Sequence, residues 1–285
     1  MSLLRRPKWY LAQFQTCFSL SNNETNGVGS RLYQSRCNST AFLNSPSFLN
    51  EGLVRAFSDE PTSQAMLKTV INGHLEAVQE LHIGCSESCT TKLMDNAAKH
   101  GHLKVLRYLH KNCSGGCTTH AMDDAARSGH LDIVKWLHEH RSEGCTTEAM
   151  NKAARYGHFE IIKWLHENRT EGCTYWAMDY AVRHGFLHIL QWLHEHRTEG
   201  CTTGAMDFAA WNGHLLIVQW LHEHRTEGCT AHAMNRAASN GYLHIVQWLH
   251  ANRTEGCTTG VMNSATRHNH LEVVQWLQKN RKEEL

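Results

Sequence analysis

The sequence predicts an all-α protein, an α-solenoid of stacked helix–turn–helix repeats, and three observations predict this fold. Tryptophan recurs at a step of 28 residues from Trp136 to Trp276. No proline follows Pro61, so nothing beyond that point blocks long helical stretches. Cysteine recurs with the same 28-residue step, at positions that we call the ladder cysteines: Cys89, Cys117, Cys145, Cys173, Cys201, Cys229 and Cys257. A fixed step of this length is typical of a repeat array.

The repeat divides the chain into two parts. One unit, residues 145–172, reads CTTEAMNKAARYGHFEIIKWLHENRTEG, and seven such units run from Cys89 to the C-terminus. A weaker eighth unit begins near Pro61. We therefore expect a leader over residues 1–60 and a repeat array over residues 61–285. A two-helix unit cannot bury its apolar face alone, so neighbouring units are expected to bury it together.

The first helix of each unit carries recognisable start and stop signals. Thr146 or Thr147 can cap this helix through its side-chain oxygen. If Thr146 is the cap, Cys145 and Met150 have the spacing of a hydrophobic staple. Alanines then form a small-residue stripe that allows helices to approach closely. Gly157 is expected to end the helix, because glycine adopts the left-handed conformation at little cost.

The second helix carries an apolar face and leads into a polar connection. Asn269 occupies the turn position in the last unit, and asparagine tolerates a positive φ better than most residues do. The polar segment NRTEG closes the unit. Apolar residues at helical spacing predict the buried face of the second helix: Phe159, Ile161, Ile162, Trp164 and Leu165.

Residues 121–137, AMDDAARSGHLDIVKWL, resemble the ankyrin repeat family. Ala125-Ala126, Gly129-His130-Leu131 and Ile133-Val134 match that family's pattern, and the resemblance recurs throughout the array. The family's unit has about 33 residues, and the residues missing here belong to the connection. The projecting β-hairpin finger is therefore expected to be reduced to a short loop. The resemblance implies a protein–protein interaction module without catalytic activity of its own.

Charge and hydropathy restrict the partners. The chain has 28 basic and 27 acidic residues, a formal charge of +1, which disfavours nucleic acid or an anionic membrane as the partner. No apolar run reaches the roughly 18 to 20 residues of a membrane-spanning helix. Residues 1–50 contain one acidic residue, Glu24, among several arginines and serines. That composition resembles a mitochondrial transit peptide, and a disordered leader remains the alternative.

The cysteines are expected to remain thiols. Equivalent positions on adjacent stacked helices lie about 8–10 Å apart, beyond the roughly 6.8 Å that a disulfide allows. Eleven cysteines then indicate a reducing compartment, the cytoplasm or nucleus. Two C-x3-C pairs, Cys85/Cys89 and Cys113/Cys117, raise the alternative of a Cys/His metal-binding repeat protein. No histidine set with zinc-site spacing accompanies them, so neither a metal nor a cofactor is predicted.

Most of the 23 histidines fall at two repeat positions. One follows the turn glycine, and Phe186 and Tyr242 replace histidine there, so a packing role is expected. The other ends the second helix, where Gln278 replaces histidine in the last unit. Glutamine preserves a neutral hydrogen bond, so a bond to the loop backbone is expected.

No catalytic motif is present, so an enzyme is not predicted. The recurring carboxylates, such as Glu171 and Glu199, lie in polar loops and are expected to be solvated.

The units differ most at their fourth, eighth, eleventh and twelfth positions, which share one side of the first helix. In ankyrin-like stacks that side faces the concave surface. Tyr175 adds an aromatic beside this side, where most sister units have threonine. The predicted partner-binding residues are the aromatics Trp176, Tyr180, Phe208 and Trp211 with the flanking arginines Arg155, Arg183 and Arg236. Trp, Tyr and Arg are enriched in interface hot spots.

We therefore predict a monomeric scaffold or adaptor that binds a protein partner on its first-helix face. Local repacking around Gly204 is the alternative explanation for the aromatics. A nucleic-acid-binding repeat protein, with arginines interleaved with aromatics, is the alternative function.

Overall fold

The computed structural model describes residues 62–84 and 89–280, which form sixteen helices and no strand. The predicted leader, residues 1–60, lies outside the described residues. The first helices of the repeats are α3 (Thr62–Ile71), α5 (Thr91–Lys99), α7 (Thr119–Ser128), α9 (Thr147–Tyr156), α11 (Trp176–Arg183), α13 (Thr203–Trp211), α15 (Ala231–Ser239) and α17 (Val261–Arg267). The second helices are α4 (Leu75–Gly84), α6 (Leu103–Asn112), α8 (Leu131–His140), α10 (Phe159–Asn168), α12 (Leu187–His196), α14 (Leu215–His224), α16 (Leu243–Asn252) and α18 (Leu271–Asn280).

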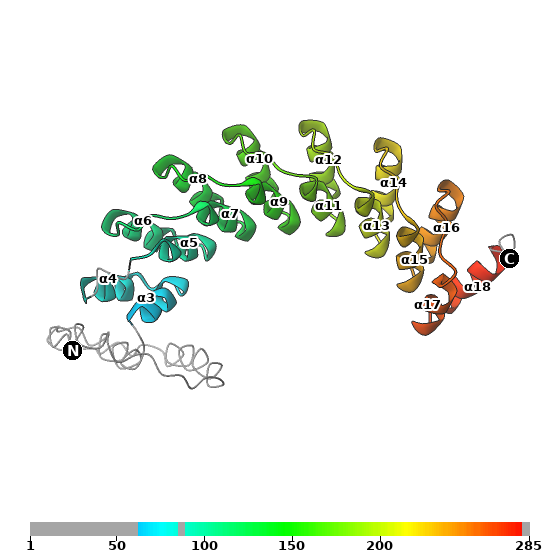
Figure 1. Ribbon diagram of the computed structural model, residues 1–285, viewed down its shortest axis with the longest axis horizontal. Coiled ribbons are helices and arrows are strands. Elements are labelled where there is room, and N and C mark those ends of the chain that lie inside the picture. Colours follow the sequence, from blue (N-terminus) through cyan, green and yellow to red (C-terminus); the bar gives the residue numbers. More distant parts are fainter. Residues whose placement is uncertain (1–61, 85–88, 281–285) are drawn as a thin grey trace, which may run out of the picture. The chain divides into compact units, whose positions relative to one another are not determined.

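The helices stack as pairs (Figure 1). Each first helix packs against its own second helix and against the first helix of the next repeat. Ala149, Ala153 and Ala154 on α9 are fully buried, so small side chains line this contact and let the first helices approach closely. One hydrophobic core runs without a break from Met66 to Leu277. The predicted all-α solenoid is confirmed.

The residues at which α9 begins and ends act as the sequence predicts. Thr146 caps α9, and its side-chain oxygen accepts a hydrogen bond from the backbone N–H of Glu148 at 3.1 Å. Cys145 and Met150, at the staple positions on either side of this cap, are both buried. Gly157 ends α9 with a left-handed φ of 80°, and Asn269 occupies the same turn position with a φ of 61°.

The histidine after the turn glycine packs against the preceding repeat. A Cβ atom added at Gly129 would lie 2.8 Å from the His158 ring, so the glycine makes room for the ring. His158 Nε2 also donates to the carbonyl oxygen of Arg127 at 3.0 Å. Phe186 covers Gly157 in the same way. The predicted packing role is confirmed, and a hydrogen bond to the previous helix adds to it.

The connection between repeats contains no strand in the described residues, so the predicted loss of the hairpin finger is confirmed. An ion pair occupies the connection instead. Arg169 donates from Nη2 to Glu171 Oε1 and from Nε to Glu171 Oε2 at 3.2 Å, and both side chains are 24% exposed. The expectation that Glu171 and Glu199 are solvated is wrong, because Glu199 makes the same pair with Arg197.

In five repeats the histidine that ends the second helix bonds to the arginine of such an ion pair: His110, His138, His166, His194 and His222. Arg169 Nη1 donates to His138 Nδ1 at 3.3 Å, which joins the connection of one repeat to the helix end of the previous repeat. The His138 ring also meets the Trp164 ring edge-on, with centroids 5.2 Å apart. The predicted bond to the loop backbone is therefore wrong at His138, whose partner is a guanidinium group that stacking brings from the next repeat.

A second bond between repeats was not predicted from the sequence. The buried carboxylate of Asp123 accepts hydrogen bonds from the backbone N–H and the hydroxyl of Thr146, both at 2.8 Å. Burial raises the pKa of Asp123, and the two bonds from Thr146 oppose that rise. The corresponding pairs in other repeats are Asp95–Thr118, Asn151–Thr174, Asp179–Thr202 and Asp207–Thr230.

The connection glycine provides a test of the Arg–Glu pair. Gly172 and Gly256 occupy the same repeat position with φ values of 69° and 65°. A Cβ at Gly172 would collide with Arg197 Nη2, whereas a Cβ at Gly256 would meet no atom of the described residues within 4 Å. We expect Gly256→Ala to cost about 1 kcal/mol from backbone strain. Gly172→Ala should cost roughly 1–2 kcal/mol more, because the Arg197–Glu199 pair must move.

Urea unfolding followed by circular dichroism measures both variants against the unsubstituted chain. Equal losses for the two variants would show that the Arg–Glu pair adjusts to the methyl group at no cost.

None of the helices in the described part of the chain is long and apolar enough to cross a membrane.

Candidate interaction surface

All seven predicted partner-binding residues lie on first helices that pack in succession, α9, α11, α13 and α15. We call these seven residues the aromatic–arginine surface: Arg155 on α9, Trp176, Tyr180 and Arg183 on α11, Phe208 and Trp211 on α13, and Arg236 on α15. Neighbouring members of this set are in contact, and each contact between repeats pairs an arginine with an aromatic ring.

The first group of contacts lies between α9 and α11. The Arg155 guanidinium lies 5.1 Å from the centroid of the Tyr180 ring. Trp176, four residues earlier on the same helix, stacks on Tyr180 with the ring centroids 5.1 Å apart. Tyr175 continues the group, 5.1 Å from Trp176. Three aromatic rings and one cation therefore form a continuous stack.

The second group lies between α11 and α15. Arg183 sits 5.1 Å from the Phe208 ring and 6.0 Å from the Trp211 ring. Arg236 approaches Trp211 from the next repeat at 4.7 Å. The Phe208 and Trp211 rings are 6.3 Å apart. Each arginine in this group is thus held over an aromatic face, and within the described residues neither arginine forms a salt bridge with a carboxylate.

Two residues outside the predicted set extend the surface. Tyr156 on α9 is 40% exposed, and Arg127 on α7 donates from Nη2 to its hydroxyl at 3.1 Å. Arg127 also lies 5.3 Å from the Tyr156 ring, and Arg155 lies 5.5 Å from it. Both residues occupy the same variable repeat positions as the predicted ones, so that pattern could have identified them.

The aromatic residues of this surface and the adjacent Tyr175 differ in how far they are exposed to solvent. Trp176 is 37% exposed and Tyr175 is 41% exposed, which is high for large aromatic side chains. Phe208 and Trp211 are half-buried, and a Cβ at Gly204 would lie 3.5 Å from the Phe208 ring. Local repacking around Gly204 therefore accounts for Phe208, whose ring covers that glycine. It does not account for Trp176, whose ring remains in contact with solvent.

The surface over α11, α13 and α15 is cationic. The carboxylates of these helices are Asp179, which is buried, and Asp207, which accepts two hydrogen bonds from Thr230. Arg183 and Arg236 are exposed on the same helices. A shallow hollow of about 230 Å³ beside Arg236 is lined by polar side chains that include His232 and Ser264.

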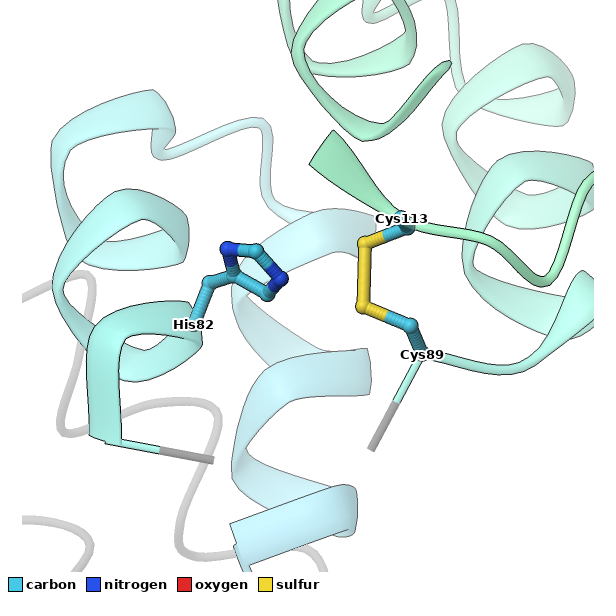
Figure 2. Close-up of side chains that lie close together, drawn as sticks. All are labelled: His82, Cys89 and Cys113. Carbon is cyan, nitrogen blue, oxygen red and sulfur yellow. A yellow bond between two sulfur atoms is a disulfide. The ribbon is translucent and has the colours of Figure 1, made fainter. Parts of the chain in front are cut away.

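A second cluster lies at the first connections of the array. Cys89 and Cys113 form a disulfide with their Cα atoms 5.6 Å apart, and the His82 ring faces it (Figure 2). The expectation that the cysteines remain thiols is wrong here. Equivalent ladder positions lie too far apart for a disulfide, but Cys113 is not a ladder cysteine and lies closer to Cys89. Cys85, of the predicted C-x3-C pair, lies outside the described residues.

The ladder cysteines from Cys117 to Cys229 are free thiols. Burial raises the pKa of Cys145 to about 12 and that of Cys173 to about 11. Such thiols are protonated at neutral pH and react slowly, because the thiolate is the nucleophile. This finding agrees with the predicted packing role of the ladder cysteines.

Stacked helix pairs of one repeated sequence define a helical repeat protein. Two family models, both described as ankyrin repeats, match this chain. The model described as having many copies matches residues 122–166 and 153–194, and the model described as having 3 copies matches residues 206–284. The chain belongs to the ankyrin repeat family. Ankyrin repeats are generally protein–protein interaction modules and generally lack catalytic activity. A comparison with curated proteins found no match.

Proposed function

We propose that this chain is a non-catalytic scaffold or adaptor that binds a protein segment on its aromatic–arginine surface. The observation that carries the proposal is the exposed stack of Tyr175, Trp176 and Tyr180 beside arginines held over aromatic rings. Exposed aromatics gathered on one face mark contact sites, and Trp, Tyr and Arg supply most hot-spot energy.

Charge selects the partner. Arg183 and Arg236 are exposed, and the carboxylates of their helices and of α13 are buried or hydrogen-bonded. A segment that combines Asp or Glu with an aromatic or aliphatic anchor would meet both features, because carboxylates bind guanidinium groups through paired hydrogen bonds. We therefore propose an acidic, partly apolar protein segment as the partner.

A peptide-display selection tests this proposal. Random 16-residue peptides displayed on phage are selected on the immobilised full chain, and the enriched peptides are synthesised with a fluorophore. We expect acidic peptides with an aromatic or leucine anchor. Trp176→Ala and Arg183→Glu should each weaken their binding by about 30-fold, the loss typical of a hot spot of roughly 2 kcal/mol.

The matched control is Leu216→Ala on α14, because Leu216 is 70% exposed and lies on a second helix. This variant should bind the peptides as the unsubstituted chain does. Peptide binding that ignores both Trp176→Ala and Arg183→Glu would overturn the assigned face. Binding of a labelled single-stranded oligonucleotide in preference to every selected peptide, with a steep loss as salt rises, would favour the nucleic-acid alternative.

The concave placement of this face, the monomeric state and the cytoplasmic or nuclear location stay predictions. The mitochondrial alternative depends on residues 1–50, which lie outside the described residues.

A further inference from the structure

The connections between repeats share one arrangement from Arg141 onward. At each connection an arginine lies between the histidine that ends the previous repeat's second helix and a ladder cysteine. Arg169, for example, donates to His138 Nδ1 at 3.3 Å and also interacts with the Cys145 thiol. The guanidinium therefore occupies a space bounded by an imidazole and a thiol.

The connection at residues 113–117 has a different set of residues. Its loop reads CSGGC, residues 113–117, where the next repeat reads RSEGC, residues 141–145. Cys113 thus takes the place of the arginine, and Gly115 takes the place of the glutamate. A Cβ at Gly115 would lie 2.5 Å from the Cys89 carbonyl oxygen, so the loop approaches Cys89 more closely than a side chain at 115 would allow. The replacement puts a second sulfur between Cys89 and His82.

The three side chains form a compact, half-buried cluster. One ligand atom from each of His82, Cys89 and Cys113 lies within 4.8 Å of the other two. His82 lies near the end of α4, Cys89 lies two residues before the first residue of α5, and Cys113 directly follows α6. Tetrahedral zinc, with Zn–S bonds of ~2.3 Å and Zn–N bonds of ~2.0 Å, needs its ligand atoms about 3.5–3.8 Å apart. Small side-chain rotations after reduction would meet that requirement.

A neighbouring tyrosine orients the imidazole. His82 Nδ1 lies 3.2 Å from the hydroxyl of Tyr108, and the two rings meet edge-on with centroids 5.8 Å apart. If Nδ1–H donates to that hydroxyl, Nε2 carries the lone pair, and Figure 2 shows one ring nitrogen pointing toward the sulfur pair. A second bond of this kind is how metal-binding histidines are held in the required tautomer. Tyr108 itself occupies the place of the recurring tryptophan, 28 residues before Trp136.

We propose that Cys89, Cys113 and His82 form a redox-controlled site for a soft divalent cation, with zinc as the best match. A dithiol reductant cleaves the Cys89–Cys113 disulfide by exchange: it supplies two electrons and two protons and becomes a disulfide itself. Zn²⁺ then displaces the two thiol protons and binds both thiolates and His82 Nε2, and water fills the fourth position. Two sulfurs and one nitrogen favour zinc over the hard cations Mg²⁺ and Ca²⁺.

The bound cation would link three segments of the chain: the end of α4, the loop before α5 and the loop after α6. The Arg–Glu pair of the later connections is absent from residues 113–117. A cation that binds only the folded, reduced chain stabilises it by mass action. The disulfide joins two of the same segments when the chain is oxidised. Either form thus links the loop before α5 to the loop after α6.

Cobalt titration of the full chain tests the proposal, with Co²⁺ as a spectroscopic substitute for Zn²⁺. The chain is reduced with a dithiol, desalted under nitrogen and titrated. We expect one equivalent of Co²⁺ with thiolate-to-cobalt charge-transfer absorption, displaced by Zn²⁺. Cys113→Ser and His82→Gln should each weaken Co²⁺ binding at least 10-fold, and Tyr108→Phe about 10-fold. His82→Gln is a conservative change, because Gln278 occupies the equivalent position in the last repeat.

Two controls separate this site from adventitious binding. Cys145→Ser removes a ladder cysteine beside an arginine and should leave Co²⁺ binding unchanged. The oxidised chain should take up no Co²⁺ until a dithiol is added. Failure of the reduced chain to bind Co²⁺ would overturn the proposal, and so would full binding by Cys113→Ser or loss of binding by Cys145→Ser. Circular dichroism confirms that each variant is folded, and peptide binding at the aromatic–arginine surface reports the other proposal separately.

Discussion

Replacing Asp179 with alanine is expected to lower the free energy of unfolding by roughly 2–4 kcal/mol. The buried Asp179 carboxylate accepts the Thr202 N–H at 3.0 Å and the Thr202 hydroxyl at 2.6 Å. Alanine would leave both donors without their acceptor at a boundary between repeats. Thr202 also caps α13, accepting from the N–H of Gly204 at 3.1 Å, so the damage would reach the next helix.

Asp179→Asn is the matched control, because the equivalent residue one repeat earlier is an asparagine that also makes two hydrogen bonds with a threonine. Asn151 Oδ1 accepts the Thr174 N–H at 3.0 Å, and Asn151 Nδ2 donates to the Thr174 hydroxyl at 3.0 Å. We therefore expect Asp179→Asn to change stability by less than about 1 kcal/mol. Urea unfolding at neutral pH measures both variants. A loss for asparagine as large as that for alanine would show that charge, and not the pair of hydrogen bonds, matters here.

The pH dependence of this pair adds a second readout. Burial raises the pKa of Asp179, and the bonds from Thr202 oppose the rise. A carboxyl group with a higher pKa in the folded chain favours folding at low pH, and that advantage fades as the pH rises through the folded pKa. The stability of Asp179→Asn relative to the unsubstituted chain should therefore improve as the pH increases from acid to neutral.

The stability of the array is expected to fall steeply between about pH 4.5 and pH 2. The hydrogen bond from Arg141 lowers the pKa of Glu143 from 4.5 to about 2 despite some desolvation. At Glu171 desolvation raises the pKa, but the bond and charge of Arg169 outweigh it and bring the pKa to about 2. The same direction holds at the three remaining pairs, where the glutamates are Glu199, Glu227 and Glu255.

The lowered pKa values of these glutamates fix the direction in which stability changes with pH. A glutamate that is more acidic in the folded chain stabilises folding above its unfolded pKa, and this contribution is lost as the pH falls through the folded pKa. We expect on the order of 1 kcal/mol from each pair, after allowance for solvent screening. Five pairs in succession would make the effect large.

A single substitution isolates the effect of one pair. Glu171→Gln should lower stability at pH 7 and flatten part of the pH dependence between pH 4.5 and 2, measured by urea unfolding at each pH. Glu167→Gln is the control, because Glu167 is exposed on α10 in the same repeat. Identical pH profiles for Glu171→Gln and the unsubstituted chain would refute the role assigned to the Arg169–Glu171 pair.

Local features of the sequence predicted the local structure well. Thr146 caps α9 and Gly157 ends it, because each depends on the chemistry of one residue and its near neighbours. The repeat pattern also located the aromatic–arginine surface, since positions that vary between units fall on one helix face. It did not reveal that Arg155 lies over Tyr180, because that contact joins two repeats and depends on how closely α9 and α11 stack.

The wrong predictions concern side-chain contacts that the repeat pattern does not specify. Glu171 was expected to be solvated, yet Arg169 pairs with it inside the same connection. His138 was expected to bond backbone, yet its partner is a guanidinium 31 residues away in the chain. The Cys89–Cys113 disulfide joins positions that are not equivalent in the repeat, so a rule for equivalent positions could not find it.

The sequence by itself determined the helix pairs, their ends, the repeat family and the variable face. Period, capping residues and turn glycines act within a few residues of one another, and a single unit contains all of them. Only the tertiary structure decided what the connections do. Stacking places the loop of one repeat against the helix end of the previous one, and there it makes arginine–histidine hydrogen bonds, buried carboxylate bonds or, at His82, Cys89 and Cys113, a cluster of sulfur and imidazole. Such contacts depend on distances between units, which no spacing within one unit encodes.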